Sequence, residues 1–284
     1  MKISQLLEET TSKFAAAGIE SSQADAEILL GFVLKLNRGE VLAKAITGEE
    51  VSDSDLETFS ALADKRAERF PLQHLTGVAH FRSLELRVGP GVFVPRFETE
   101  GVTQLAIDAV RSVAKETPVV VDLATGSGAI ALSIAYEVPN AEVHAVELSE
   151  DALSYTKENF AKYAPDADLR QGDLADAFSD LDGKVDVLIS NPPYIPDEMI
   201  PIYPEVHLHD PSLALYGGAD GLDLVRKVDL SAQRLLVSGG TLIIEHADMQ
   251  GPSIRAILEA SGWAQVRTHK DLAGRDRAVS ARKL

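Results

Sequence analysis

The segment Asp122-Leu123-Ala124-Thr125-Gly126-Ser127-Gly128-Ala129 joins two apolar stretches of different character. Val119–Leu123 is typical of a buried strand, and Ala129–Glu137 is typical of a helix. Gly126 and Gly128 permit a tight turn and a close approach of the backbone to a ligand. A strand, a glycine loop and a helix in this order predict the first unit of an α/β sheet domain.

Strands and helices continue to alternate after this loop. Further strands are expected at residues 142–146, 167–171, 185–190, 241–245, 265–269 and 278–281. Helices are expected from a Ser149 cap to about Tyr163, and over residues 222–237 and 253–260. The order predicts a mostly parallel seven-stranded sheet with helices on both faces, which binds ligands at the carboxyl ends of its strands.

Residues 1–70 have a helical pattern, because apolar side chains such as Leu6, Leu7 and Phe14 recur at three- and four-residue steps. Cap residues 52–55 precede a helix expected over residues 56–70, and Pro71 ends it. Over residues 71–95, apolar and polar residues alternate around the expected turn Gly89-Pro90-Gly91. We expect a helical bundle at 1–70, a β-hairpin linker at 71–95 and an α/β domain at 96–284.

Composition and charge exclude several classes of site. The 284 residues carry 27 basic and 44 acidic side chains, and the net charge of −17 disfavours nucleic acid as a partner. The absence of cysteine excludes disulfides, thiolate nucleophiles and Cys-ligated metals. No apolar stretch is long enough to span a membrane, and residues 1–18 lack the apolar core of a signal peptide. We expect a cytoplasmic protein that does not bind membranes.

An acidic residue, Glu147, lies 19 residues after Gly128, at the end of the next expected strand. This spacing suits a carboxylate that accepts both hydroxyls of a ribose. With Ala131 the loop also fits the pattern G-x-G-x-x-A, so a dinucleotide is an equally good candidate on pattern alone. A plain turn between strand and helix is the structural alternative.

Charge separates these cofactor candidates. Asp122, Glu147 and Asp173 stand at successive strand ends, and no Lys or Arg occurs between Thr117 and Lys157. A pyrophosphate would meet these carboxylates with only a helix N-terminus to offset them, whereas a sulfonium is attracted to them. The charges favour S-adenosylmethionine, although solvated acidic residues would give the same pattern.

The motif Asn191-Pro192-Pro193-Tyr194 directly follows the expected strand Val185–Ser190. The two prolines lack backbone donors, so the carbonyls of Asn191 and Pro192 form a stiff frame of acceptors. With the side-chain oxygen of Asn191, this frame suits the two N–H groups of a planar NH₂, and the Tyr194 ring offers a face for stacking. A loop that merely stops a strand explains the prolines but not Asn191 or Tyr194.

The chain resembles S-adenosylmethionine-dependent methyltransferases that modify amide or exocyclic nitrogens, and more narrowly the HemK/PrmC family. The resemblance covers nearly the whole chain. It rests on the glycine loop and the Asn-Pro-Pro-Tyr motif, and also on the runs Pro71-Leu72-Gln73-His74-Leu75-Thr76-Gly77, Phe93-Val94-Pro95-Arg96, Glu98-Thr99-Glu100, His209-Asp210-Pro211, Ala214-Leu215, Gly217-Gly218 and Gly274-Arg275-Asp276-Arg277.

The family methylates the side-chain amide of the glutamine in the Gly-Gly-Gln motif of class-1 peptide chain release factors. The resemblance implies that the cofactor-binding residues are Ala124, Thr125, Gly126, Ser127, Gly128, Glu147, Asp173, Leu174 and Asn191. It places the substrate glutamine on Asn191, Pro192, Pro193 and Tyr194, with catalytic roles for Asn191, Pro192 and Tyr194. Two residues depart from the family pattern: Ala124 stands where many members have glycine, and Phe97 where a proline is common.

An amide nitrogen is a poor nucleophile because its lone pair is delocalised into the carbonyl. Hydrogen bonds from its two hydrogens to Asn191 and Pro192 oxygens would localise that lone pair and aim it at the sulfonium methyl. No general base is required, because the methylated nitrogen loses its proton readily to water.

Two other functions and two other sites fit the sequence less well. An adenine-N6 methyltransferase shares Asn-Pro-Pro-Tyr, but the net charge of −17 disfavours it. A non-catalytic nucleotide-binding or protein-interaction module would bind cofactor without turnover. His207, His209 and Asp210 lack an evident third metal ligand, so no metal is expected. Ser127 lacks the setting of a hydrolase nucleophile.

Overall fold

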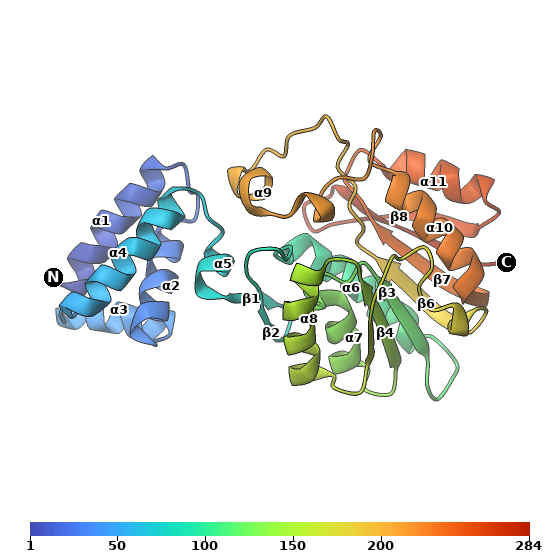
Figure 1. Cartoon of the computed structure of the whole chain (residues 1–284), viewed down its shortest axis with the longest axis horizontal. Coiled ribbons are helices and arrows are strands. Elements are labelled where there is room, and N and C mark those ends of the chain that lie inside the picture. The colour runs from blue at the N-terminus through green and yellow to red at the C-terminus, as the bar shows by residue number, and fades with distance from the viewer. The chain divides into compact units, whose positions relative to one another are not determined.

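The computed structural model describes residues 1–284, which form two compact units (Figure 1). The helical unit comprises Met1–Gly77 and Ile202–His209. The sheet unit comprises Val78–Pro201 and Asp210–Leu284. No helix in either unit combines the length and the apolar character needed to cross a membrane.

The helical unit is a small bundle with its own core. Its helices are α1 (Ile3–Ala16), α2 (Ser22–Leu34), α3 (Arg38–Thr47), α4 (Asp53–Ala67), α5 (Leu72–Thr76) and α9 (Pro204–His209). Phe14, Leu29 and Phe59 are fully buried at its centre. Ser52 caps α4 by accepting the N–H of Asp55, as the sequence predicts.

Ion pairs hold residues 202–209 in the helical unit. Glu205 accepts hydrogen bonds from Arg66 at 2.9 Å and from Arg69 at 2.6 Å. Arg66 is itself buried and bonds Asp25 at 2.8 Å. Because these charges are largely shielded from water, removing one partner would leave another uncompensated.

The sheet unit contains a seven-stranded sheet of mostly parallel strands, in agreement with the prediction. The strands are β3 (Val119–Leu123), β4 (Glu142–Glu147), β5 (Asp168–Gln171), β6 (Val185–Ser190), β7 (Leu236–Glu245), β8 (Ala264–Lys270) and β9 (Asp276–Arg282). They are arranged in the order β5-β4-β3-β6-β7-β9-β8, with β9 antiparallel to both neighbours. The strand order reverses between β3 and β6, so a ligand site is expected at their carboxyl ends.

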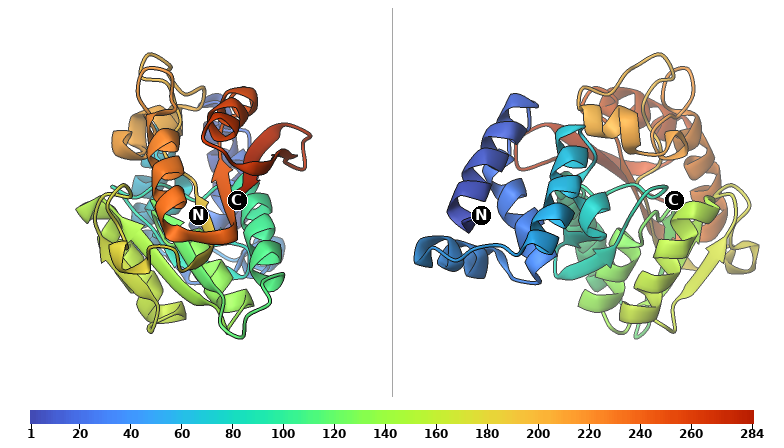
Figure 2. Two further views of the ribbon diagram at one scale, coloured as in Figure 1. Left: turned by 90° about the vertical axis from the view of Figure 1, so that its right-hand side faces the viewer. Right: turned by 60° about the vertical axis from the view of Figure 1, so that its left-hand side comes forward.

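Helices cover both faces of this sheet (Figure 2). One apolar cluster joins it to α6 (Phe97–Arg111), α7 (Ala129–Glu137) and α8 (Glu150–Tyr163). A second cluster, on the other face, includes α10 (Asp223–Leu235) and α11 (Gly251–Ala260). Successive β3 residues Val120 and Val121 fall in different clusters, as the alternation of strand side chains requires.

The hairpin of residues 71–95 differs from the expectation in its turn. Residues 72–76 form α5, and the two strands are β1 (Val78–Phe81) and β2 (Leu84–Arg87). The chain reverses at Arg82, whose φ is +50°, while residues 92–94 form no strand. Arg82 is held there by Glu137, with Nε to Oε1 at 2.6 Å. A tertiary ion pair therefore fixes a turn that contains no glycine.

The helix expected over 222–237 ends earlier. α10 stops at Leu235, and β7 begins at Leu236, five residues before the expected strand. The added residues pair with neighbouring chain segments, since Leu236 lies opposite Val185 of β6 and Gly239 bonds Lys283. Helix α6 is not among the helices expected from the sequence; Phe97 occupies its first position, where proline is also favoured.

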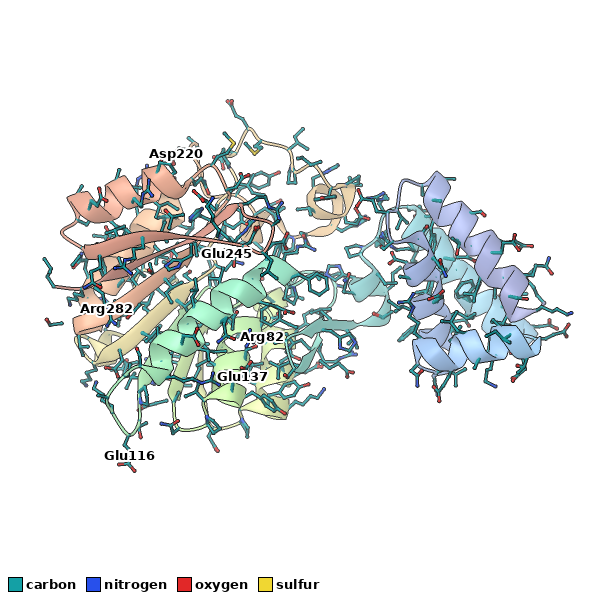
Figure 3. The ribbon with its side chains drawn as sticks, turned by 180° about the vertical axis from the view of Figure 1, so that it is seen from behind. Arg82, Glu116, Glu137, Asp220, Glu245 and Arg282 are labelled. Atoms are coloured by element: carbon teal, nitrogen blue, oxygen red, sulfur yellow. The ribbon has the colours of Figure 1, made fainter.

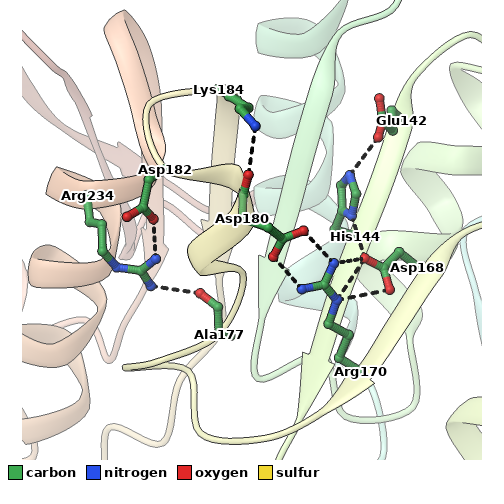
Figure 4. Close-up of polar contacts among 9 residues, drawn as sticks. All are labelled: Glu142, His144, Asp168, Arg170, Ala177, Asp180, Asp182, Lys184 and Arg234. Atoms are coloured by element: carbon green, nitrogen blue, oxygen red, sulfur yellow. Dashed lines mark hydrogen bonds and ion pairs between the residues drawn. The ribbon is translucent and has the colours of Figure 1, made fainter.

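Polar contacts tie β4, β5 and the segment before β6 together (Figure 4). His144 contacts Asp168 at 2.9 Å and Glu142 at 3.1 Å. Arg170 binds both Asp168 and Asp180, and its hydrogen bonds lower the pKa of Asp180 to about 2. This network is a structural support for the edge of the sheet, so His144 has a structural role.

Candidate active site

The glycine loop after β3 follows a left-handed backbone path. The φ angles are +61° at Ala124, +59° at Gly126 and +86° at Gly128. Glycine adopts such angles without strain, but a Cβ makes them unfavourable. Ala124 therefore stands at a position where glycine would be less strained. At Gly128 a Cβ would lie 2.9 Å from the Phe160 ring, so this glycine is also required for packing.

Asp122 supports the glycine loop through hydrogen bonds from the buried end of β3. It is fully buried, and its Oδ2 accepts the Thr125 hydroxyl at 2.6 Å and the Ala131 N–H at 3.2 Å. Burial raises the pKa of Asp122 to about 7. This carboxyl thus supports the loop, and its burial rules out the alternative of a solvated acid at this strand end.

Glu147 lies at the end of β4 and faces the same loop. Its Oε2 accepts the Gly126 N–H and its Oε1 the Ser149 N–H, each at 2.8 Å. Burial raises the pKa of Glu147, while these two backbone bonds oppose the shift. Each carboxylate oxygen retains a second lone pair, so the side chain can accept two ribose hydroxyls while it holds the loop.

Asp173 differs from the expectation of strand-end acids without basic partners. It is half-exposed, and its Oδ2 lies 3.4 Å from Lys227 Nζ on α10. The expectation was wrong at this residue because α10 brings a lysine 54 residues away in the chain to the same edge. The next residue, Leu174, is buried in the apolar cluster beneath α10.

Two residues of α8 support the loop, although no sequence motif predicts this role for them. Thr156 donates to the Gly126 carbonyl at 2.5 Å. Asn159 donates to the Ser127 carbonyl at 2.9 Å and also bonds the backbone of Arg87. Both side chains are fully buried, and their position on the inner face of an amphipathic helix is the only sequence signal they give.

The Asn-Pro-Pro-Tyr motif lies at the same edge of the sheet as the glycine loop. Strands β3 and β6 are neighbours, with Leu123 opposite Ser190. The Ser190 hydroxyl donates to the Leu123 carbonyl at 2.7 Å. The last residues of the two strands are therefore joined directly, and the loops that follow them start side by side.

Residues 215–221 and Gln250 pack against the backbone of the motif. Gln250 donates to the Tyr194 carbonyl at 2.8 Å. A Cβ at Gly217 would lie 2.5 Å from the Pro193 carbonyl, and one at Gly221 would lie 2.3 Å from the Tyr194 carbonyl. These glycines allow the backbone of residues 217–221 to pack closely against the motif and support its shape.

The polar groups of the motif are partly committed. The Asn191 amide nitrogen lies 3.5 Å from the Thr99 hydroxyl, while Pro192 is buried and Pro193 half-buried. Burial, together with the charge of Glu245, raises the pKa of Tyr194 to about 12. Tyr194 is therefore neutral near pH 7.

Arg96, which precedes α6, pairs with the buried Asp210 and stacks over the Phe93 ring at 4.6 Å. Burial raises the pKa of Asp210 to about 6, and Arg96 opposes the shift. His209 instead packs against Phe70 in the helical unit, with 4.0 Å between ring centroids. No three His, Asp or Glu side chains come together as a metal site.

Comparison with known proteins matches both units. Residues 5–77 match the family described as PrmC N-terminal domain, and residues 83–200 the family described as methyltransferase small domain. The chain is 50% identical to the release factor glutamine methyltransferase of Streptomyces coelicolor, over 97% of this chain and 96% of the relative. It is 42% identical to that of Bifidobacterium longum, over 99% of each. The crystal structure of a protein-(glutamine-N5) methyltransferase (release factor-specific) from Alicyclobacillus acidocaldarius is 25% identical, covering 69% of this chain and 98% of that one, with a TM-score of 0.43.

Proposed function

The chain belongs to the release factor glutamine methyltransferase family, and we propose that it methylates the glutamine of the Gly-Gly-Gln motif in class-1 release factors with S-adenosylmethionine. The observation that carries this proposal is the direct bond between Ser190 and Leu123. This bond holds the glycine loop, which would bind the cofactor, and the Asn-Pro-Pro-Tyr motif, which would bind the substrate amide, at one edge of the sheet.

The residues present fit the proposed cofactor. Glu147 has free lone pairs for ribose hydroxyls, and Gly126 and Gly128 leave the loop without side chains at its tightest points. When bound, S-adenosylmethionine supplies an electrophilic methyl group on a sulfonium. Leu174, which is 6% exposed, would border the base with its apolar side chain, and the carboxylate of Glu147 would add negative charge to the site that holds the sulfonium cofactor.

The residues of the motif act on the substrate amide. The side-chain oxygen of Asn191 and the carbonyl of Pro192 accept the two amide hydrogens, which concentrates electron density on the nitrogen. The two prolines and the backing glycines keep these acceptors rigid, so little reorganisation is needed at transfer. Tyr194 remains neutral and offers its ring to the planar amide. The proton of the methylated nitrogen passes to water.

The substrate is a protein and the site of action is the cytoplasm in this proposal. The net charge of −17 supports a protein substrate over duplex nucleic acid, since binding to phosphates depends on basic side chains. The test is mass analysis of a digest of a class-1 release factor after incubation with enzyme and cofactor. One added methyl group on the Gly-Gly-Gln peptide supports the proposal. Methylation of an adenine oligonucleotide at an equal rate would refute it.

A further inference from the structure

A chain of buried polar contacts extends from Asn191 into the protein. The Asn191 amide nitrogen lies 3.5 Å from Thr99 Oγ1, and Thr99 Oγ1 lies 3.0 Å from Glu245 Oε1. Thr99 is in the first turn of α6, and Glu245 is the last residue of β7 (Figure 3). Thr99 is 3% exposed and Glu245 is 2% exposed.

Glu245 is an unusual residue to bury. Its side chain makes one hydrogen bond, from Thr99 to Oε1, and Oε2 has no partner. No basic side chain forms an ion pair with it, although Arg277 lies near enough to act on it through space. A buried carboxyl with so few partners destabilises the fold, and groups of this kind concentrate at functional sites.

The hydroxyl of Thr99 determines which groups donate and which accept in this chain of contacts. It has a single hydrogen, which it donates to Glu245 when that carboxyl is ionised. The oxygen of Thr99 can then only accept, so it must be faced by the NH₂ of Asn191 and not by its carbonyl. The Asn191 carbonyl oxygen is thereby turned away from Thr99, and it is free to accept a hydrogen from the substrate.

We propose that Thr99 and Glu245 are positioning residues that fix the carboxamide of Asn191 with its oxygen presented to the substrate amide. The inference rests on the proposed function, because it deepens the role of Asn191 in that reaction. A reversed Asn191 would present NH₂ to the NH₂ of the substrate, and two donors cannot bond. The Glu98-Thr99-Glu100 run of the sequence thus gains a role through its middle residue.

The first test needs no substrate. The chain has four asparagines, so selective ¹⁵N-asparagine labelling gives few side-chain NH₂ signals, and Asn191→Ala identifies the one of interest. Hydrogen exchange of the Asn191 NH₂ should be slowed in the parent and in Thr99→Ser. It should be faster in Thr99→Val, which has the same shape but no hydroxyl. The other three asparagines report whether the fold is intact. Equal exchange in Thr99→Val and the parent would overturn the proposal.

The second test is a double-mutant cycle on methyl transfer to a release factor. Thr99→Val should lower the single-turnover rate by about 10-fold or more with an unchanged KM for the release factor, and Thr99→Ser should restore most of it. In the Asn191→Ala background, Thr99→Val should have no further effect, because Thr99 acts through Asn191. An equal loss in both backgrounds would show a merely structural role. If the parent methylates no release factor, the proposed function fails, and the exchange experiment still decides the orientation of Asn191.

Discussion

Ser190 and Leu123 are joined by a hydrogen bond of 2.7 Å between the hydroxyl of one and the carbonyl of the other. The bond connects the carboxyl ends of β6 and β3, where the strand order of the sheet reverses. The acceptor frame and the glycine loop begin at these two residues. Their relative position is therefore set by the rigid sheet and not by flexible loops, as transfer between two bound molecules requires.

The role of Glu147 in cofactor binding is testable by a small change. Glu147→Gln keeps the size of the side chain but removes its charge and one acceptor. It should weaken binding of S-adenosylmethionine by about 1.5–3 kcal/mol, the range for hydrogen bonds to charged groups. Calorimetry measures the change, and Glu150→Gln, an exposed residue three positions further, is the control. Equal affinities for all three proteins would rule out a ribose contact at Glu147.

The left-handed backbone angle at Ala124 predicts that a glycine at this position would stabilise the protein. The φ of +61° is unfavourable for alanine and free of strain for glycine. Ala124→Gly should therefore raise the free energy of unfolding by about 0.5–1.5 kcal/mol, since the relief of left-handed strain exceeds the added entropy of the unfolded chain. Ala256→Gly, at an exposed position of α11, should instead lower it by about 0.5–1 kcal/mol. Denaturant unfolding that shows both substitutions destabilising to the same degree would contradict this account.

Asp122 predicts a change in the pH dependence of stability. Burial raises its pKa to about 7, so the folded state keeps the proton that the unfolded state loses near pH 4. Its stabilising contribution is complete below the unfolded pKa and is lost as the pH rises through 7. Asp122→Asn stays neutral, so it should gain at least about 1 kcal/mol relative to the parent between pH 5 and pH 8. Urea unfolding at these two pH values measures it; a constant difference would be the contrary result.

The ionisation of Glu245 predicts that the rate of methyl transfer depends on pH. Burial raises the pKa of this carboxyl to about 7 and Glu98 adds to the shift, while the Thr99 hydrogen bond and the charge of Arg277 oppose it. The other titratable groups beside it are Tyr194, whose pKa is raised, and His246, whose pKa is lowered by burial. Only the ionised form compels Thr99 to donate, so the single-turnover rate of the parent should rise between pH 6 and pH 8. Glu245→Gln does not titrate, and its rate should be flat over this range. Parallel profiles for the two proteins would exclude Glu245 as the titrating group.

The sequence was sufficient to predict the sheet and most of its strands. Val119–Leu123 and Val185–Ser190 are short segments that are mostly apolar, each containing one aspartate, and such segments indicate strands buried on both faces. The α/β order then placed Glu147 and Asn191 at one edge. Local sequence patterns therefore predict those parts of the fold in which the local conformational preference and the burial of the residues agree.

Other features depend on contacts between distant residues, and the sequence could not show them. The hairpin turn at Arg82 is fixed by Glu137, 55 residues away, and not by the Gly89-Pro90-Gly91 run. Lys227 reaches Asp173 only because α10 packs over that edge. Thr99 and Glu245 are 146 residues apart and meet only where α6 crosses the end of β7. No spacing rule reports such pairs.

In the proposed reaction, Asn191 acts on the substrate amide in the transition state. The most direct test of this role is single-turnover methyl transfer to a release factor by the parent and by Asn191→Ala, both saturated with S-adenosylmethionine. The variant should fold normally and bind the release factor nearly as well, while its rate falls by about 10²–10³, the effect of removing one contact made chiefly in the transition state. A variant that transfers the methyl group at the parental rate would contradict the account, because Asn-Pro-Pro-Tyr would then be only a rigid loop.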